Sequence, residues 1–424
     1  EDCAYPIDSE LLNSPNCYIV SPGTTSEDIP VGKPYLLWKM RPDLGELSLS
    51  DKVSVHLLWQ DTQGLITDVA LVDGDKGGFS KFNVQAAASK TGNALVAVRI
   101  GSNGDETDPI RWSWHIWVTG YNPDTNTNGT TYAHDNGDNK TYTFMDRNLG
   151  ATIIDYEDPN SMGLMYQWGR KDPFTANERF GDNQGIRPLY NKDGTLLIEL
   201  NEIDNGGVSG SGIKHVEVAA GTTSNLNNSI QNPMTFYYGE YKYANSRMAP
   251  FDWFTSDDTG AGSDDELWGA SGSKSPFDPC PKGWRVPAYS SGNKSPWNHF
   301  LDSWSGFPSL QLVGSGDGTG IVFGDYPSSN VVGLGFYPYN FERIPREFSK
   351  PGSVGSNPGH VTGGLFPYVS SNDIYGHYWT ANAESGTPNA KGMYINFSPF
   401  ESVAIADLET PSRAYGAFVR CVKE

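Results

Sequence analysis

The chain has 424 residues, a length that predicts two or three domains at a typical size of about 150 residues each. Charged residues make up only 19% and aromatic residues 12%, with 48 Gly and 28 Pro, which is typical of a loop-rich, β-dominated exported protein rather than a helical cytosolic one. The net charge of -20, with no cluster of Lys and Arg, argues against nucleic acid and anionic lipid as partners, because both need a basic surface.

Neither a membrane span nor a signal peptide is evident in the chain. No apolar run approaches the roughly 20 residues that a transmembrane helix needs, so we expect no transmembrane segment. The opening residues lack the charged and apolar regions of a signal peptide. The sequence is therefore typical of a mature or trimmed form, before which a signal peptide or a lipid anchor could have stood.

The region from Lys33 to Thr119 predicts short strands, because apolar and polar residues alternate between turn residues. Six or seven strands over this length predict an immunoglobulin-like β-sandwich in residues 1–121. The indoles of Trp112, Trp114 and Trp117 are expected in the core or at the domain junction rather than on a ligand surface. The predicted strands are 35–40, 53–59, 65–72, 79–87, 94–100 and 111–119.

Residues 122–141 are rich in Asn, Asp, Gly and Thr and lack hydrophobic periodicity, which predicts an interdomain loop. Within it, Asp124, Asn126, Asn128 and Asp135 match the spacing of a calcium loop, with Asp in place of the usual final Glu. No helices are predicted on either side, so an ordinary interdomain turn is the favoured interpretation. We expect no cofactor, and calcium at this loop is the alternative that the spacing leaves open.

Residues 142–424 predict a second domain in which long Gly, Ser, Asn and Pro stretches separate short aromatic islands. Two helices are predicted there, at 161–171 and 296–304. A domain of this size with so little regular structure needs covalent support.

The four cysteines form two sets, Cys3 with Cys17 and Cys280 with Cys421. An even count in an exported composition favours disulfides, although four cysteines allow three connectivities. We expect the pair within each set. A Cys280–Cys421 bridge would close most of the second domain and stabilise it by roughly 4 to 5 kcal/mol through loop-closure entropy. The absence of CxxC motifs and Cys/His clusters argues against structural zinc.

The aromatic loops of the second domain are the binding candidates, because tyrosine-rich loops on a rigid scaffold give contact area at little entropic cost. Core packing is the alternative for about half of these side chains. The candidates are Tyr237, Tyr238, Tyr241, Tyr243, Trp253, Tyr337, Tyr339 and Tyr368.

No arrangement of residues predicts catalysis. The chain lacks a nucleophile elbow, and its seven histidines form no HExxH or HxH group. The paired acids at 257–258 and 264–265 lie in Ser/Gly-rich loops, which are typical of a solvated surface. We therefore do not expect an enzyme.

Four sequence blocks carry a family resemblance. In order, they resemble the Fibrobacter-type major paralogous domain, a group with a C-type-lectin-like fold in exported Bacteroidetes proteins. Residues 16–20 (NCYIV) and 112–121 also resemble segments that precede this domain in related surface proteins, some of them regarded as tip components or adhesins of fimbrillin-type pili. The blocks are 142–152 (YTFMDRNLGAT), 163–174 (GLMYQWGRKDPF), 278–287 (DPCPKGWRVP) and 415–424 (YGAFVRCVKE).

The resemblance implies a mainly β protein with few helices, in which a large, loop-rich, C-type-lectin-like domain spans residues 142–424. It implies an extracellular, cell-surface adhesin-like protein, such as a fimbrial (pilus) tip subunit. Its partners would be fimbrial subunits or a host or microbial surface protein or glycan. The alternative is a glycan-binding surface lipoprotein of a polysaccharide-uptake system, anchored to the outer membrane by lipid.

Two properties of the lectin-like fold are not expected here. Calcium-dependent lectins use Glu-Pro-Asn or Gln-Pro-Asp with Trp-Asn-Asp, whereas this chain has QNP at 231–233 and WNH at 297–299. Formylglycine-generating oxidases share the fold but need reactive cysteines, whereas Cys280 and Cys421 are expected in a structural bridge.

Overall fold

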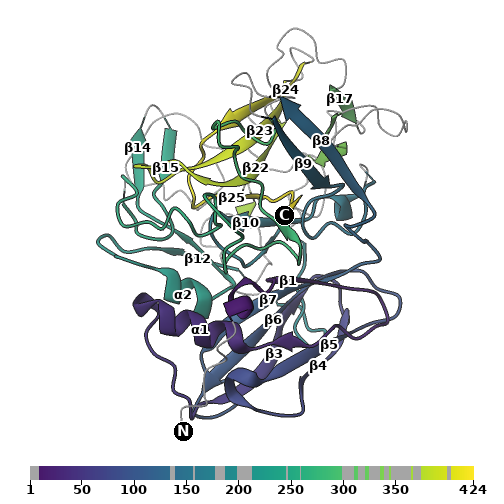
Figure 1. Cartoon of the computed structure of the whole chain (residues 1–424), viewed down its shortest axis with the longest axis vertical. Coiled ribbons are helices and arrows are strands. Elements are labelled where there is room, and N and C mark those ends of the chain that lie inside the picture. The colour runs from purple at the N-terminus through teal and green to yellow at the C-terminus, as the bar shows by residue number, and fades with distance from the viewer. Residues whose placement is uncertain are drawn as a thin grey trace.

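The computed structural model is mainly β, which confirms the predicted fold class (Figure 1). Among the described residues two segments are α-helices, and neither is long and apolar enough to cross a membrane. The structure describes residues 9–133, 139–155, 158–176, 187–197, 213–244, 247–257, 259–297, 310–313, 320–323, 335–338, 343–344, 364–365, 374–398 and 403–424.

The first half of the chain forms two sheets and a helix. One sheet has the order β1-β7-β6-β3 and the other the order β2-β5-β4. Strand β1 joins β7 in parallel, and the other neighbours are antiparallel. The sheets pack against each other, with the rings of Phe82 and Trp114 5.1 Å apart. The elements are β1 (Cys17–Val20), β2 (Ile29–Pro30), α1 (Gly32–Met40), β3 (Lys52–Gln60), β4 (Ile66–Val72), β5 (Lys81–Ala86), β6 (Gly92–Gly101) and β7 (Ile110–Val118), with 3-10 turns at Ser9–Asn13, Pro42–Leu44 and Gly77–Phe79.

Helix α1 replaces the strand that was predicted at 35–40, while the five later strands of this half are confirmed. Pro34 lies in the first turn of the helix, where its missing N–H costs no hydrogen bond. Tyr35 and Trp38 are three residues apart and both buried, as on one face of a helix. The prediction was wrong because six residues with this many apolar side chains fit both the two-residue period of a strand and the 3.6-residue period of a helix.

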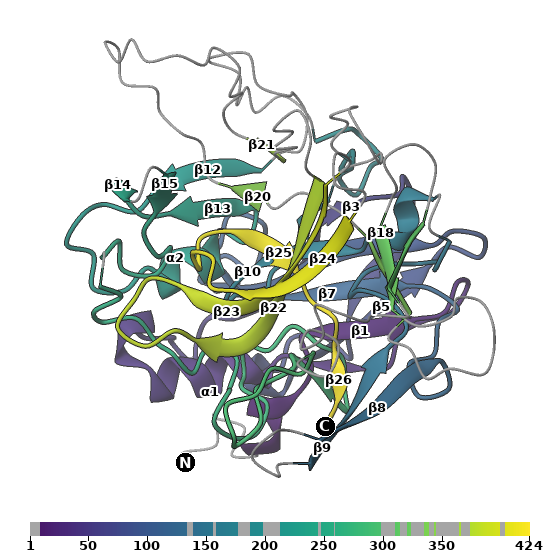
Figure 2. The same ribbon diagram turned by 90° about the horizontal axis from the view of Figure 1, so that it is seen from above.

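The second half forms several small sheets around one larger sheet. The larger sheet has the order β11-β10-β25-β22-β23-β24, with β20 on β25 and β21 on β20. Strands β16-β26-β9-β8 and β17-β18-β19 form two more sheets, and β12-β13 and β14-β15 form pairs (Figures 1 and 2). Helix α2 lies against β7 of the first half.

The elements of the second half are mostly short. They are β8 (Thr127–Ala133), β9 (Asn139–Met145), a 3-10 turn (Pro159–Ser161), β10 (Leu164–Gln167), β11 (Phe174–Thr175), β12 (Lys214–Glu217), α2 (Leu226–Gln231), β13 (Thr235–Tyr238), β14 (Tyr241–Ala244), β15 (Arg247–Pro250), β16 (Trp284–Arg285), β17 (Leu310–Val313), β18 (Gly320–Phe323), β19 (Gly335–Pro338), β20 (Arg343–Ile344), β21 (Gly364–Leu365), β22 (Ile374–Ala383), β23 (Ala390–Ser398), β24 (Val403–Glu409), β25 (Gly416–Phe418) and β26 (Val422–Lys423).

Two predictions for this half were wrong. The expected interdomain loop at 122–141 contains β8 and the start of β9, which pair with each other. The expected helix at 161–171 is instead a 3-10 turn followed by β10, whose four residues are all buried. Gly163 ends the turn at φ +82°, where a Cβ would meet the Leu149 carbonyl at 2.7 Å, so the chain leaves the helical region there. Most of the helix predicted at 296–304 lies outside the described residues.

The Cys280–Cys421 disulfide is confirmed. The two Cα atoms lie 6.1 Å apart across a sequence separation of 141 residues. Strand β26 follows Cys421 directly and pairs with β16 and β9, so the bridge fixes the chain end between two earlier segments.

The expected Cys3–Cys17 pair is not formed. Cys17 is a free, buried thiol in β1, and Cys3 lies outside the described residues. Strand β1 is paired with β7, and Cys17 also forms an isolated backbone β-bridge with Pro281 of the second half. Burial raises the pKa of the Cys17 thiol and keeps it protonated.

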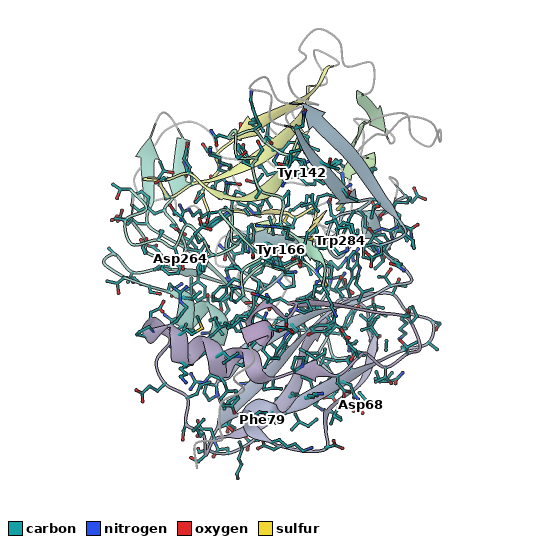
Figure 3. All side chains as sticks on the ribbon, viewed as in Figure 1. Asp68, Phe79, Tyr142, Tyr166, Asp264 and Trp284 are labelled. Carbon is teal, nitrogen blue, oxygen red and sulfur yellow. A yellow bond between two sulfur atoms is a disulfide. The ribbon has the colours of Figure 1, made fainter. Side chains whose placement is uncertain are left out.

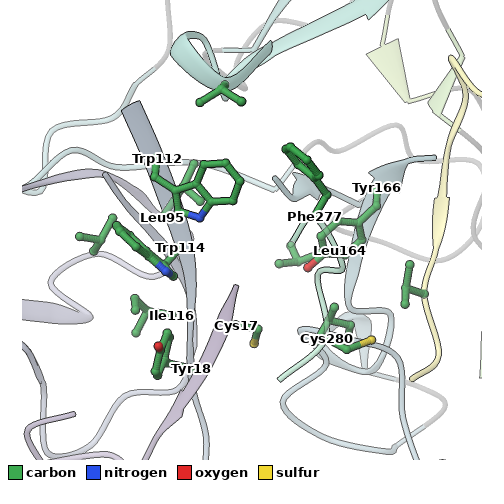
Figure 4. Close-up of a cluster of buried hydrophobic side chains, with 14 of the residues drawn as sticks. Cys17, Tyr18, Leu95, Trp112, Trp114, Ile116, Leu164, Tyr166, Phe277 and Cys280 are labelled. Atoms are coloured by element: carbon green, nitrogen blue, oxygen red, sulfur yellow. The ribbon is translucent and has the colours of Figure 1, made fainter. Parts of the chain in front are cut away.

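The two halves share one hydrophobic core. Buried residues from Cys17 to Cys421 form a continuous cluster, and the rings of Trp112 and Phe277 meet 5.5 Å apart between the halves (Figure 4). Tyr166 and Trp284 lie inside the molecule, whereas Asp68 and Phe79 mark the outer surface of the first half (Figure 3). The sandwich and the loop-rich half are thus packed as one body.

Replacing both Cys280 and Cys421 by Ser should lower the free energy of unfolding by about 4 to 5 kcal/mol, because the unfolded chain gains the entropy of an open loop. Guanidinium titration without reductant measures this loss. The Cys17→Ala variant, which keeps the bridge, is the control. An unchanged titration midpoint, or free thiols at 280 and 421 in the unreduced protein, would contradict the structural role of the disulfide.

Candidate functional site

The predicted aromatic candidates whose side chains are described do not form a binding surface. Tyr237, Tyr238, Trp253 and Tyr337 are all at most 7% exposed, so the prediction that they bind ligand was wrong and the alternative of core packing holds for them. Tyr241 and Tyr243 belong to β14, but their side chains lie outside the described set, as do Tyr339 and Tyr368 altogether.

These rings are buried because the loop-rich half builds its core from aromatic rings and arginines. Trp253 Nε1 donates to the Trp168 carbonyl oxygen at 2.7 Å. The Arg420 guanidinium lies 3.9 Å from the centre of the Tyr337 ring. Arginines of this half also donate to backbone carbonyl oxygens outside strands, as Arg285 does to those of Gly269 and Gly272, both at 2.5 Å.

The residues of the predicted calcium loop do not lie in one loop. Asn128 lies in β8, where it is paired with Phe144, whereas Asp124 and Asn126 precede that strand. The Asp124 carboxylate is exposed and lies 3.4 Å from Lys423 Nζ. Asp135 lies outside the described residues. Over the described ranges, no three His, Cys, Asp or Glu side chains are grouped to hold a metal ion.

The junction between the halves depends on the side-chain amide of Asn16. Its oxygen accepts from Trp112 Nε1 and Lys33 Nζ, each at 3.0 Å. Its nitrogen donates to the carbonyl oxygens of Pro276 and Asp278 at 2.7 and 2.8 Å. All four hydrogen-bonding positions of the amide are used, two toward each half. A single buried side chain therefore bridges the two halves with four hydrogen bonds.

Three lysines are buried around this amide, namely Lys33, Lys171 and Lys274. Desolvation lowers the pKa of each ammonium group. Lys171 Nζ donates to Asp172 Oδ1 of the second half and to Ser113 Oγ on β7 of the first half, both at 2.5 Å, so a charge paired within the second half is also hydrogen-bonded across the junction. Buried ammonium groups are tolerated only with such acceptors, which makes the junction geometrically specific.

Lys274 fixes the turn that carries the disulfide. Its Nζ donates to the carbonyl oxygens of Cys280, Pro281 and Trp284 at 2.6, 2.9 and 2.6 Å. The Asp278 carboxylate closes the same turn from inside by accepting from the backbone N–H groups of Cys280 and Val286, each at 2.8 Å. The turn is thus held from within by five hydrogen bonds.

A buried histidine lies in the same interface. His115 Nε2 is 2.9 Å from Asn93 Oδ1, and Tyr166 OH is 3.4 Å from His115 Nδ1. The amide of Asn93 donates to the Asp61 carboxylate at 2.8 Å, which orients its oxygen toward the imidazole. His115 is therefore neutral with its proton on Nε2, and burial lowers its pKa to about 3.

A surface cleft of about 340 Å³ lies between the start of β8 and strand β19. The cleft brings together residues far apart in the sequence. Its described lining comprises Thr125, Asn126, Thr127, Asp146, Ile154, Gly335 and Phe336.

Hydrogen bonds and an arginine–aromatic contact hold the walls of the cleft in place. The Asp146 carboxylate accepts two hydrogen bonds from Arg147, at 2.7 and 3.2 Å. Arg147 in turn lies 3.9 Å from the centre of the Tyr121 ring, and Tyr121 OH donates to the Asn126 carbonyl oxygen at 2.9 Å. Opposite, the Phe336 carbonyl oxygen accepts from Arg420. The cleft is preformed, with amide, hydroxyl, carboxylate and apolar groups on its walls.

Sequence reasoning singled out Asn126 alone among the cleft residues, and for a different ligand. Asp146 lies in the first block of the family resemblance and Phe336 in a short aromatic segment, but no spacing connects them. Comparison with protein-family models, with curated proteins and with solved structures gave no match for this chain.

Replacing Asn16 by Ala should lower the free energy of unfolding by about 3 to 5 kcal/mol, because two carbonyl oxygens, an indole N–H and an ammonium group at the junction each lose one hydrogen bond. Urea titration measures the loss. The matched control is Asn13→Ala, which removes an exposed amide three residues earlier. Equal effects of the two substitutions would show that the Asn16 bridge adds nothing to stability.

Stability should fall in acid through His115. Its folded pKa is depressed, so the unfolded chain binds the proton more tightly below about pH 6.5, and stability decreases by about 1.4 kcal/mol per pH unit from there toward pH 3. Between pH 7 and pH 5 the wild type should lose about 2 kcal/mol more than His115→Gln. Chemical denaturation at both pH values tests the difference, and parallel losses would contradict it.

Proposed function

We propose that this chain is an exported cell-surface adhesin-like binding protein, and specifically a fimbrial tip subunit, in which the second half binds and the first half attaches. The proposal adopts the function that the four sequence blocks imply by resemblance. In it, the second half is the C-type-lectin-like domain and the first half the immunoglobulin-like sandwich.

The observation that carries the proposal is the rigid connection between the two halves. A protein that holds a cell to a surface must transmit force from its ligand to its anchor without unfolding between them. Here the loop-rich half is closed by the Cys280–Cys421 bridge, and its bridge-bearing turn is hydrogen-bonded to the first half through Asn16. Such a connection supports display of a fixed surface.

The burial of these aromatic residues excludes them as the binding surface of the second half. Since Tyr237, Trp253 and Tyr337 stabilise the core, they are not available to a ligand. The cleft between β8 and β19 offers a preformed concave site, and concave sites with a few convergent polar groups are where proteins most often bind small ligands. We therefore assign the binding role to the second half and place its contact at this cleft and the surrounding loops.

The test is attachment. Beads coated with the full chain should adhere to host epithelial cells or to partner bacteria, and the soluble chain should compete. The Cys280→Ser/Cys421→Ser variant should lose adhesion at temperatures where its second half unfolds, while Cys17→Ala should keep it. Purification of the chain from its own cells should also recover fimbrial subunits.

Two results would contradict the proposal. One is a failure of the coated beads to adhere to any of the surfaces. The other is recovery of the chain with polysaccharide-uptake components instead of fimbrial subunits, which would favour the glycan-binding lipoprotein.

A further inference from the structure

We infer that the cleft between β8 and β19 binds a neutral pyranose ring, and that it does so without a metal ion. This inference rests on the proposed binding role of the second half and adds the ligand class, the contact residues and the metal independence.

The charge of the cleft favours a neutral ligand. Asp146 is the charged residue among the described lining residues, and Arg147 pairs with both of its carboxylate oxygens. The pair leaves no net charge at the cleft floor, so neither an anion nor a cation gains a counter-ion there. The remaining lone pairs of a carboxylate that is already oriented can still accept hydrogen bonds from hydroxyl groups.

The lining matches the two kinds of surface on a sugar ring. Asn126 supplies an amide and Thr127 a hydroxyl, which can donate to and accept from neighbouring sugar hydroxyls, and the Thr125 hydroxyl, which donates to the Asn122 carbonyl oxygen, can accept. The half-buried Ile154 side chain supplies an apolar contact for the C–H face of the ring, whereas the Phe336 side chain is 3% exposed and belongs to the core. Polar groups on one side and carbon on the other suit a pyranose better than a purely apolar ligand.

The size and stiffness of the cleft agree with this assignment. Ligand sites in proteins span roughly 300 to 1,000 Å³, so a cleft of about 340 Å³ holds a small ligand such as one or two rings. Tyr121 holds the backbone at Asn126, and Arg420 holds the backbone at Phe336. Because these walls are already ordered, binding costs little conformational entropy.

The oxygens of the cleft are poorly placed for calcium. The Asn126 carbonyl oxygen accepts from Tyr121, and both Asp146 oxygens accept from a guanidinium group whose positive charge repels a cation. Calcium needs 6 to 8 oxygen ligands, at about 2.3 to 2.6 Å. Recognition is therefore by direct hydrogen bonds and is insensitive to chelation.

The experiment is saturation-transfer NMR on the full chain in EDTA. The probes are glucose, galactose, mannose, fucose, N-acetylglucosamine and N-acetylgalactosamine, with glucuronic and sialic acids as anionic comparisons. At least one neutral sugar should bind, with an affinity on the order of 1 mM that calcium leaves unchanged. Asn126→Ala and Asp146→Asn should each weaken binding at least ten-fold, whereas Asn13→Ala, on an exposed amide of the first half, should not.

The inference is overturned if no neutral sugar binds, if binding requires calcium, if the acidic sugars alone bind, or if both cleft variants bind like the wild type. The bead assay separates this result from the proposed function. Adhesion without sugar binding would reject the pyranose site and leave the adhesin standing. Sugar binding without adhesion to any surface would reject the adhesin proposal and leave the pyranose site standing.

Discussion

The covalent bond between Cys280 and Cys421 is the constraint on which the second half depends. It brings the chain end beside a turn from the middle of the sequence, where β26 pairs with β16 and β9. The residue before the second cysteine, Arg420, is thereby placed where its guanidinium contacts the Tyr337 ring and donates to the Phe336 carbonyl oxygen. One wall of the cleft is thus held in place by a residue that the disulfide positions.

The same turn also joins the two halves. On its inner side Lys274 and the Asp278 carboxylate saturate the backbone groups of the turn. On its outer side, the Asp278 carbonyl oxygen accepts a hydrogen bond from the Asn16 amide, and Pro281 forms a backbone β-bridge with Cys17 of β1. A loop that closes its own domain covalently and is fully hydrogen-bonded has little freedom to move. It can therefore serve as a stiff contact between the two halves.

Buried arginine and lysine side chains stabilise the loop-rich half by donating hydrogen bonds to its backbone. Short strands leave many carbonyl oxygens without a ladder partner, and each buried one needs a donor. Arginine and lysine supply several donors from one side chain, so Arg170, Arg285 and Lys274 each hold two or more oxygen atoms in place. Aromatic rings pack against such cations, as Tyr237 and Trp253 do against Arg170 and Tyr337 does against Arg420, which explains why these rings are in the core.

The sequence alone determined the mainly β class, the strands from Lys52 to Val118 and the Cys280–Cys421 bridge, because alternation, turn residues and cysteine chemistry are local or compositional signals. The sequence predicted the wrong element at 35–40 and at 161–171, because short apolar runs fit both the strand period and the helix period. Only the tertiary structure decided which aromatic rings are buried, and that Asn126, Asp146 and Phe336 line one cleft. Burial and convergence depend on contacts between segments far apart in the chain, and no local pattern encodes such contacts.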